Sequence, residues 1–441
     1  MAEATIYAPA TAPGRAAVAV LRITGANAAE AARLLTGREP PEPRRAALRR
    51  LRDPRDGSII DEALVLWFPG PRSETGEDML EIQHHGGHAV LAELLEILGG
   101  VEGFRPASPG EFTRRAFLNG KLDLTAAEGL ADLIDATTRA QARQALRQLE
   151  GALGRLYGDW RERLLGALAL IEAEIDFAAE EEVPDAMLAR VRPDLERLRA
   201  EMAAHLADGH RGERLRAGVT VAVIGAPNVG KSSLVNLLAR RDVAIVTPHA
   251  GTTRDVIEVQ LDLDGLPVIL LDTAGLRETE DPIEAEGIAR ARRRAETADL
   301  RLHILDATAP ETTLADFDEA TLLVVNKIDL VPASRLPAGA IGLSCKTGTG
   351  VGELLAVLTN RARRLLGTGE TPLLTRARHR EAVQAAAAAL DRFLEGAAAG
   401  AELALLAEDL RLAARAVGRI TGTVGVEDVL DRIFATFCIG K

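Results

Sequence analysis

A nine-residue segment that follows a short apolar run constrains the fold of this chain more than any other feature. Val219–Ile224 is rich in β-branched residues, and the sequence GAPNVGKSS follows it at 225–233. This segment matches the pattern G-x-x-x-x-G-K-S at the strand-to-helix position where that pattern binds phosphates. The glycines let backbone amides surround the phosphates, Lys231 neutralises their oxygens, and Ser232 offers a hydroxyl to Mg²⁺. The segment therefore predicts a nucleotide-binding α/β domain.

Further motifs follow the phosphate loop in the order that a GTPase requires. The sequence DTAG at 272–275 places the Asp272 carboxylate on the magnesium side and a glycine amide at the γ-phosphate. Between them lies GTTRD at 251–255, in which we favour Thr253 as the switch threonine that reaches Mg²⁺. In NKID at 326–329, Asp329 can accept hydrogen bonds from guanine N1 and the exocyclic amine, a pattern that adenine lacks. SCK at 344–346 supplies the last base-contacting loop, so we predict that the nucleotide is GTP.

The predicted GTP site has twenty residues. They are Gly225, Asn228, Val229, Gly230, Lys231, Ser232, Ser233, Thr247, Thr252, Thr253, Asp272, Thr273, Ala274, Gly275, Asn326, Lys327, Asp329, Ser344, Cys345 and Lys346.

The catalytic group is less well defined by the sequence than the nucleotide site. Leu276 stands where a water-orienting glutamine would follow the DTAG motif, and an apolar side chain cannot position a nucleophile. Glu284, in an acidic switch segment, is a candidate for this role, and a solvated surface charge is an equally good interpretation of it. Asn228 is unusual because its side-chain oxygen could coordinate a cation beside the phosphates.

The length of 441 residues predicts about three domains at roughly 150 residues each. We expect an N-terminal α+β domain at 1–120, and a helical domain built from two separate stretches, 121–216 and 369–441. Between these stretches, at 217–368, β-rich runs alternate with helical segments, which predicts an inserted α/β domain with a mainly parallel, doubly wound sheet. The expected strands are Ala16–Ile23, Ala63–Phe68, Val219–Ile224, Ile257–Leu263, Val268–Leu271, Leu302–Leu305 and Leu322–Val325.

Local signals add three expectations for the helices. Apolar residues at helical spacing predict a helix over Ala89–Leu98. The sequence TAAE at 125–128 fits a capping box, in which Thr125 begins a helix as its N-cap. Pro184 and Pro193 are expected to break the long helical stretch that contains them.

Composition limits the classes of function. Acidic residues (65) outnumber basic ones (53), so the net charge of −12 excludes a uniformly basic nucleic-acid surface but allows a local basic patch. The basic runs at 44–55, 290–294 and 376–380 are expected to be solvated faces, although one of them could hold nucleic-acid phosphates. Only two cysteines and the lack of an apolar run of about 18 residues predict a cytoplasmic protein without a membrane span.

Motifs outside the GTPase segment resemble one family closely. They are TGED at 75–78, HGG at 85–87, PGEFT at 109–113, FLNGKLDL at 117–124 and the terminal CIGK at 438–441. Together with an inserted GTPase domain, they resemble the MnmE (TrmE) family of tRNA-modifying GTPases of bacteria and organelles. The resemblance covers essentially the whole chain.

The resemblance implies a three-part architecture and a specific reaction. The family has an N-terminal folate-binding domain that mediates homodimerisation, a discontinuous helical bundle and an inserted Ras-like P-loop GTPase domain. With an FAD-containing partner, MnmG, it adds an aminomethyl-type group to carbon 5 of the wobble uridine of certain tRNAs. A tetrahydrofolate derivative, in the methylene or formyl form, supplies the one-carbon unit. K⁺ stimulates GTP hydrolysis through dimerisation of the GTPase domains and takes the place of an arginine finger.

The resemblance also implies roles for individual residues. Glu284 would orient the attacking water and Cys438 would take part in the tRNA reaction, so both are expected to be catalytic. Ser232 and Thr253 would bind Mg²⁺. The potassium shell would comprise Asn228, Thr247, His249 and Thr252, and the folate contacts would be Arg22, Glu77, Lys121 and Lys441.

Two residues depart from the family pattern, and a group of three histidines raises the question of a metal site. Glu74 and Thr24 stand where the family usually has tyrosine and serine, and we expect neither to touch an assigned ligand. His84, His85 and His88 lie together without accompanying cysteines, so we expect a structural or folate-lining role rather than a metal site.

Two other functions fit parts of the sequence. One is a ribosome-assembly GTPase of the Era or Der type, but such proteins carry an RNA-binding domain after the GTPase and lack helical halves on both sides. The other is a GTP-dependent scaffold that is not an enzyme, which Leu276 leaves open.

Overall fold

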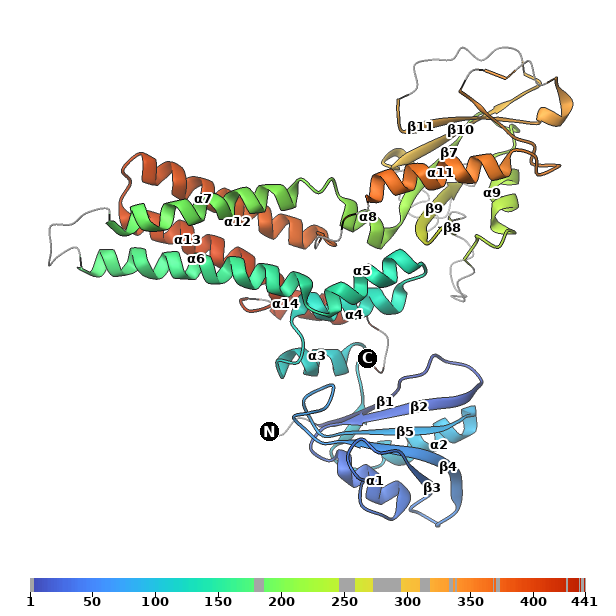
Figure 1. The fold of residues 1–441 in the computed structure, drawn as a ribbon. Coiled ribbons are helices and arrows are strands. Elements are labelled where there is room, and N and C mark those ends of the chain that lie inside the picture. The colour runs from blue at the N-terminus through green and yellow to red at the C-terminus, as the bar shows by residue number, and fades with distance from the viewer. Residues whose placement is uncertain are drawn as a thin grey trace, which may run out of the picture. The chain divides into compact units, whose positions relative to one another are not determined.

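The computed structural model describes residues 4–177, 186–245, 258–272, 295–309, 318–332, 336–337, 339–367, 369, 373–425, 427–435, 437 and 440. The chain divides into two compact units (Figure 1). Unit 1 comprises 1–131, 149–162 and 414–441, and unit 2 comprises 132–148 and 163–413. Each unit is therefore assembled from segments that lie far apart in the sequence.

Unit 1 contains a six-stranded sheet with the strand order β3-β4-β5-β2-β1-β6. All its neighbouring strands are antiparallel except β1 and β6, which run parallel. Helices α1 and α2 pack with the strands in one apolar cluster that includes Leu21, Ile82 and Leu98. The element bounds are β1 Thr5–Pro9, β2 Ala16–Thr24, α1 Ala28–Thr36, β3 Ala47–Arg52, β4 Ile59–Phe68, β5 Met79–Gly86, α2 His88–Gly99 and β6 Phe104–Pro106.

The sequence located some of these elements and missed others. The expected strands Ala16–Ile23 and Ala63–Phe68 and the expected helix Ala89–Leu98 are confirmed, each with a small extension. The other strands and α1 were not expected. β5 ends in histidines and β3 carries three arginines, so neither has the continuous apolar composition of a typical buried strand.

The helices of unit 1 join the C-terminal end of the chain to its N-terminal third. α3 (Glu111–Leu118), the start of α4 (Leu124–Asp135) and α14 (Glu427–Phe434) meet in a cluster that contains Leu124, Leu430 and Phe437. Gly110 has a φ of 68°, and a Cβ there would come within 2.5 Å of the backbone oxygen of Phe434. Only glycine allows this close approach, so the junction is specified by the PGEFT motif.

The predicted cap of α4 is wrong by two residues. Asp123 caps the helix, because its carboxylate accepts the backbone N–H of Ala126 at 2.8 Å. Thr125 lies inside the first turn, and its hydroxyl donates to the same carboxylate at 2.6 Å. A carboxylate that accepts both groups competes better for the N-cap position than the threonine hydroxyl does.

The helices of unit 2 form a bundle in which α7 lies beside α12 (Figure 1). An ion pair between Arg199 and Asp391, at 2.6 Å, joins these two helices. Pro193 lies inside α7 and does not break it, contrary to expectation, because buried Val191, Leu195 and Leu198 hold both sides of the proline in place. Pro184 lies outside the described residues. The bounds are α5 Arg139–Leu149, α6 Ala152–Phe177, α7 Ala186–Leu206, α8 Arg211–Ala217, α12 Ala377–Ala398 and α13 Leu403–Thr421, of which α5, α6 and α13 extend into unit 1.

The second sheet lies in unit 2 and has the strand order β12-β11-β10-β7-β9-β8. β8 and β9 are antiparallel and the remaining pairs are parallel, as expected for a mainly parallel sheet. Helices α9 (Lys231–Ala239) and α11 (Val351–Leu366) share its apolar core. The strands are β7 Val219–Ile224, β8 Glu258–Leu263, β9 Leu266–Asp272, β10 Leu300–Asp306, β11 Thr321–Asn326 and the unexpected two-residue β12 Ile341–Gly342.

Among the described residues, no helix is both long and apolar enough to cross a membrane.

Candidate nucleotide-binding site

The phosphate loop lies between β7, a central strand of the sheet, and the N-terminus of α9. Gly225 has a φ of 146° and Gly230 a φ of 104°, which are conformations that other residues rarely adopt. A Cβ at Gly225 would lie 2.4 Å from the backbone oxygen of Ile304, and one at Gly230 would lie 2.2 Å from the Asn326 amide nitrogen. The loop is thus a backbone cradle that side chains would fill, and it leads into the N-terminus of α9, which favours anions.

Lys231 is the charged residue of this cradle. Its ammonium group donates to the backbone oxygens of Gly225 and Ala226, both at 2.8 Å. These bonds fold the lysine back over its own loop, where it can exchange a carbonyl for a phosphate oxygen. Its location fits the predicted role in neutralising the β- and γ-phosphates.

Asn326 connects the phosphate loop to the base-contacting loop. Its side chain is 3% exposed, and its amide nitrogen donates to the backbone oxygen of Val229 at 2.9 Å. Its side-chain oxygen accepts the backbone N–H of Cys345 at 3.1 Å. One buried amide therefore fixes two loops that are more than a hundred residues apart in sequence, and buried amides of this kind rarely tolerate the loss of a partner.

Lys327 supports the phosphate loop from the next position. Its ammonium group donates to the backbone oxygen of Asn228 at 3.1 Å and to the Asp306 carboxylate at 2.6 Å. Burial by itself raises the pKa of Asp306, but hydrogen bonds from Lys327 and Thr308 outweigh it and lower the pKa to about 2. Asp306 is therefore ionised at any physiological pH and keeps Lys327 in place.

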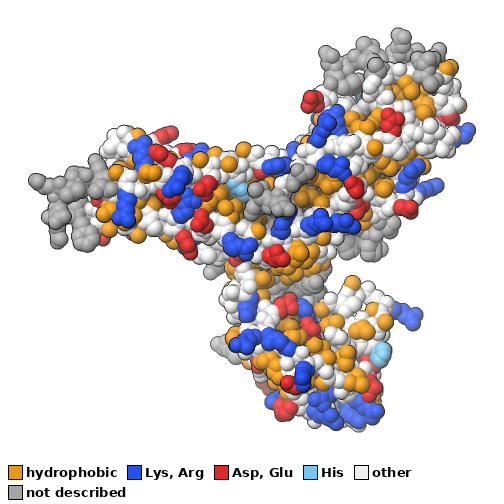
Figure 2. Space-filling model, viewed as in Figure 1, with side chains coloured by type: hydrophobic (Ala, Val, Ile, Leu, Met, Phe, Trp, Pro, Cys, Tyr) orange, Lys and Arg blue, Asp and Glu red, His pale blue; other side chains and the backbone are white. Residues whose placement is uncertain are grey.

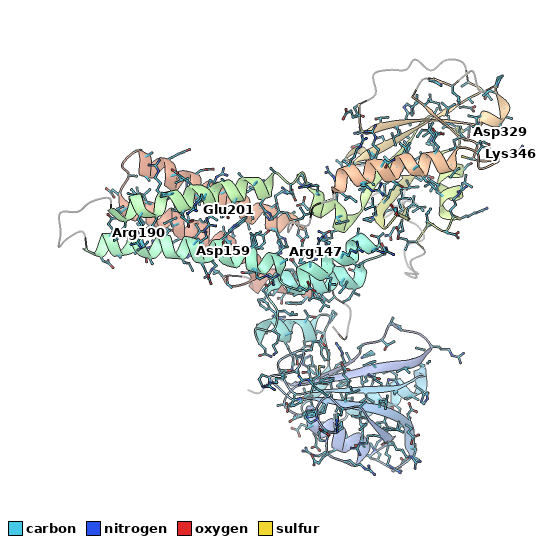
Figure 3. The ribbon with its side chains drawn as sticks, in the orientation of Figure 1. Arg147, Asp159, Arg190, Glu201, Asp329 and Lys346 are labelled. Carbon is cyan, nitrogen blue, oxygen red and sulfur yellow. The ribbon has the colours of Figure 1, made fainter. Side chains whose placement is uncertain are left out.

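Asp329 and Lys346 lie at the base-contacting end of the site, where Figure 3 labels both. The Asp329 carboxylate accepts a hydrogen bond from the Ser344 hydroxyl at 2.7 Å, and that hydroxyl also accepts the backbone N–H of Thr347 at 3.2 Å. Asp329 is exposed and so remains open to a ligand on its other side. The NKID and SCK motifs therefore meet at one end of the site.

Asp272 and Ser232 lie where a magnesium ion would be expected. Asp272 is the last residue of β9, is 1% exposed, and is paired in register with Val223 at the end of β7. Ser232 is exposed in the first turn of α9, next to the phosphate loop. Carboxylate and hydroxyl oxygens are ligands that Mg²⁺ prefers, so the donor set fits this ion.

Several predicted site residues lie outside the described residues. They are Thr247, His249, Thr252, Thr253, Thr273, Ala274, Gly275, Glu284, Cys438 and Lys441.

A second polar cluster lies in unit 1, around the TGED segment. Glu77 accepts hydrogen bonds from the Arg115 guanidinium, at 3.0 Å at the closest, and from the Thr24 hydroxyl at 3.2 Å. Arg115 is 3% exposed and also pairs with Glu111 at 3.1 Å. Burial raises the pKa of Glu111, but hydrogen bonds from Arg105, Ser108 and Arg115 outweigh it and leave that pKa below its ordinary value. Two carboxylates and a buried arginine thus form one network.

Arg22 lies in the same region and is held by two other carboxylates. It pairs with Glu74 at 3.0 Å and with Glu81 at 2.9 Å. Both departures from the family pattern lie in this region, where Glu74 contacts Arg22 and Thr24 contacts Glu77. Lys121, the third described residue predicted to bind folate, is exposed.

Comparison with known proteins decides the family. A model described as "MnmE helical domain" matches residues 124–438, and one described as "GTP-binding protein TrmE N-terminus" matches residues 5–121. The chain belongs to the MnmE family. A protein of Parvibaculum lavamentivorans named tRNA modification GTPase MnmE is 56% identical, over 99% of this chain and 100% of its own length. A protein of Rhodospirillum rubrum with the same name is 55% identical over 99% of each chain.

A solved structure of the FeoB G-domain from Methanococcus jannaschii is 27% identical and covers 33% of this chain and 98% of its own. The TM-score of 0.23 is too low to indicate that the two whole chains share a fold. The full-length match to MnmE proteins decides against a ribosome-assembly GTPase of the Era or Der type.

The histidine group of this MnmE-family chain has no metal-binding geometry. His84 is 1% exposed, and its Nδ1 lies 2.8 Å from the backbone oxygen of His85. His85 is exposed and contacts the Asp61 carboxylate at 2.7 Å. Within the described part of the chain, no group of three or more His, Cys, Asp or Glu side chains could hold a metal ion.

The sequence missed two charged residues that the structure places at these sites. Arg115 lies between the PGEFT and FLNGKLDL motifs, and Asp306 lies at the end of β10. A weak signal existed for Asp306, because it ends a parallel strand on the side where ligands bind. For Arg115 we find no signal in the sequence, because its burial depends on contacts with Glu77 and with the backbone of Ala4.

Proposed function

We propose that this chain hydrolyses GTP and acts in the modification of tRNA. The observation that carries the proposal is the pair of loops that Asn326 joins, one shaped for phosphates and one for guanine. The membership in a family whose relatives are named tRNA modification GTPases supports the second half.

Each part of the nucleotide has residues that would hold it. The amides of the phosphate loop and Lys231 would bind the phosphates, and Asp329 would accept from the guanine edge. Ser232, Asp272 and Thr253 lie at sequence positions suited to Mg²⁺, which supplies charge neutralisation during phosphoryl transfer. The chain's own residues orient the phosphates and exclude other bases.

We propose further that K⁺ stimulates hydrolysis and that Glu284 orients the attacking water. Asn228 supports the first point, because it adopts a φ of 64° that leaves its exposed side chain at the phosphate loop. Its backbone oxygen is already occupied by Lys327, so the side-chain oxygen is the atom available to a cation. Thr247, His249 and Thr252 would complete the shell.

A hydrolysis assay tests these assignments. We expect Glu284→Ala to lower kcat by about 100-fold or more in K⁺ buffer, the order of effect of a positioned catalytic group. GTP affinity should stay unchanged, because the glutamate would act on water. Glu353→Ala, on α11, is the matched control and should behave as the parent. A Glu284→Ala protein that hydrolyses GTP at the parental rate would refute the assignment and favour a scaffold or another catalytic group.

The unit 1 cluster is proposed as a folate site. A reduced pteridine presents an N–H edge that suits the Glu77 carboxylate, while Lys121 and Lys441 suit the carboxylates of its glutamate tail. Arg22 fits this role only in part, because Glu74 and Glu81 occupy its guanidinium. Gly440 supports the contribution of the C-terminus, because a Cβ there would lie 2.1 Å from the backbone oxygen of Pro9. The bound folate would supply the one-carbon unit.

The complete proposal is that a homodimer acts with the FAD-containing partner MnmG to add an aminomethyl-type group to the wobble uridine, with Cys438 in the tRNA reaction. The domains would be 1–120, 121–216 with 369–441, and 217–368. Mass spectrometry of nucleosides from cells that lack this protein tests it. We expect wobble uridines without the carbon-5 group, restored by the parent gene. Unchanged wobble uridines would refute the proposed reaction and leave the GTPase assignment to the hydrolysis assay.

A further inference from the structure

Several arginines of the two basic runs that the structure describes are paired with carboxylates. In the run at 44–55, Arg45 pairs with Glu42, Arg50 with Glu62, and Arg55 with both Asp53 and Glu96. In the run at 376–380, Arg376 pairs with Asp132 and Arg380 with Asp208 and Glu213. Figure 2 likewise shows acidic and basic side chains interspersed over the face in view. Both runs are therefore partly neutralised by carboxylates of the chain itself.

Helix α5 has the opposite character. Its sequence, RAQARQALRQL, holds three arginines and no acidic residue. Arg139, Arg143 and Arg147 are spaced four residues apart, so they lie within about 80° of one another around the helix axis. No carboxylate in the described ranges pairs with any of the three, which remain available to an external anion. Figure 3 labels Arg147.

The other side of α5 is buried and anchored. Gln144, Ala145 and Gln148 are buried. The Gln144 amide donates to the backbone oxygen of Gly212 in α8 at 3.1 Å, and the Gln141 amide donates to that of Arg216 at 3.0 Å. At the start of the helix, the Ala140 N–H donates to Gly265, in the turn between β8 and β9, at 3.0 Å. On this fixed helix, Arg139 and Arg143 are exposed and Arg147 is half-buried.

We propose that the arginine face of α5, formed by Arg139, Arg143 and Arg147, binds the phosphate backbone of tRNA. This inference rests on the proposed function for its choice of nucleic acid. Guanidinium groups form paired hydrogen bonds with phosphate oxygens, and the fixed helix limits the entropy that they lose on binding. The described part of α5 exposes no aromatic side chain, so the face holds backbone phosphates and does not stack on bases.

Charge removal with a matched control tests the proposal. The test variant of the full chain is Arg139→Gln/Arg143→Gln/Arg147→Gln. The control is Arg33→Gln/Arg45→Gln/Arg50→Gln, which removes the same charge from exposed arginines in surface ion pairs of little energetic value. A third variant replaces the three α5 arginines by lysine. Binding of a fluorescent tRNA that carries a wobble uridine is measured against salt concentration, and basal GTP hydrolysis reports on folding.

We expect the glutamine variant of α5 to bind tRNA on the order of 30- to 100-fold more weakly at about 0.1 M salt. The slope of log affinity against log salt should become shallower by about 2 to 3, and the lysine variant should keep the parental slope. The control should bind like the parent, and GTP hydrolysis should be unchanged in all variants.

Equal weakening in the α5 variant and the control would overturn the proposal, because net charge alone would then explain binding. Parental affinity in the α5 variant, or no tRNA binding by the parent, would also overturn it. The proposal would also be overturned if the α5 glutamine variant bound tRNA like the parent and lost binding to an acidic protein instead. The proposed function is decided separately, by whether the parent gene restores the wobble uridine in deleted cells.

Discussion

The nucleotide site of unit 2 and the TGED cluster of unit 1 both bring polar groups together near strand ends. They differ in whether backbone atoms or charged side chains supply those groups. The nucleotide site consists mainly of backbone atoms, which glycines expose and one buried amide, Asn326, holds in place. The TGED cluster consists of charged side chains, in which Arg22 and Arg115 hold four carboxylates.

This difference decides how each site responds to substitution. A backbone cradle depends on a few glycine positions and tolerates change elsewhere, because its donors are present at every residue. A charged network depends on the identity of each member, and removal of one partner leaves another charge without compensation. The two sites should therefore fail in different ways, which the following substitutions test.

Arg115→Ala should give the largest effect. It would leave Glu77 without its buried guanidinium and Glu111 with Arg105 as its remaining arginine, and breaking a buried ion pair costs about 3–5 kcal/mol. We expect this loss in the stability of residues 4–121, measured by hydrogen exchange of β1 and β2 in the full chain. Arg114→Ala is the control, because the neighbouring Arg114 forms an exposed pair with Asp431 and should cost less than about 1 kcal/mol. Equal destabilisation by the two variants would contradict the role of the buried network.

Gly230→Ala should damage the backbone site without unfolding it. The positive φ of Gly230 is unfavourable for alanine, and the new Cβ would displace the Asn326 amide that joins the two loops. We expect GTP to bind about 100-fold more weakly, or about 2.7 kcal/mol, in a titration with a fluorescent analogue. Gly352→Ala is the control, because a Cβ there meets nothing within 4 Å. If both variants bind GTP equally well, the cradle is not the phosphate site.

The same difference explains what could be predicted from the sequence. Strands β7, β9 and β11 of the GTPase segment were located correctly because each is a short apolar run that a motif follows. The positions of Asn326, Asp329 and Ser344 at one site were therefore foreseeable. In unit 1, the partners of Glu77 and Arg22 come from separate strands and from α3, and only the folded chain brings them together. The contact of Glu74 with Arg22 was accordingly missed.

Local rules also failed where other contacts compete with them, from neighbouring residues or from packing. Thr125 has the spacing of a capping residue, yet the preceding Asp123 takes that position. Pro193 is a helix breaker by its chemistry, yet packing on both sides keeps α7 continuous. The sequence did not predict the arginine face of α5, because its three arginines are spaced along a helix and do not form a run. Their proposed role depends on the lack of a carboxylate paired with them in the described ranges, which a linear sequence does not show.

Asp306→Asn tests the ion pair between Asp306 and Lys327, which supports the phosphate loop. Asparagine would still accept from Lys327 but would lose the ionic attraction, so we expect GTP affinity to fall about fivefold, close to 1 kcal/mol. The pKa of Asp306 is lowered to about 2, so its contribution is complete above the ordinary carboxyl pKa and is lost only as the pH falls towards 2. The ratio of parental to variant affinity should therefore stay constant from about pH 5 to 8. Asp318→Asn, in an exposed pair with Arg301, is the control.

Glu74→Gln should have the smallest effect, and its direction distinguishes a structural network from a ligand site. Glu74 is 42% exposed at its side chain, so its pair with Arg22 contributes at most about 1 kcal/mol to stability. Its removal frees part of the Arg22 guanidinium, and a reduced folate should then bind up to about fivefold more tightly in calorimetry. Glu62→Gln breaks a comparable exposed pair with Arg50 and should leave folate binding unchanged. Weaker binding in Glu74→Gln would instead mean that Glu74 positions Arg22 for the ligand, and unchanged binding would remove Arg22 from the folate site. A charged network thus allows one surface carboxylate to tune a ligand site, which a cradle of backbone amides does not.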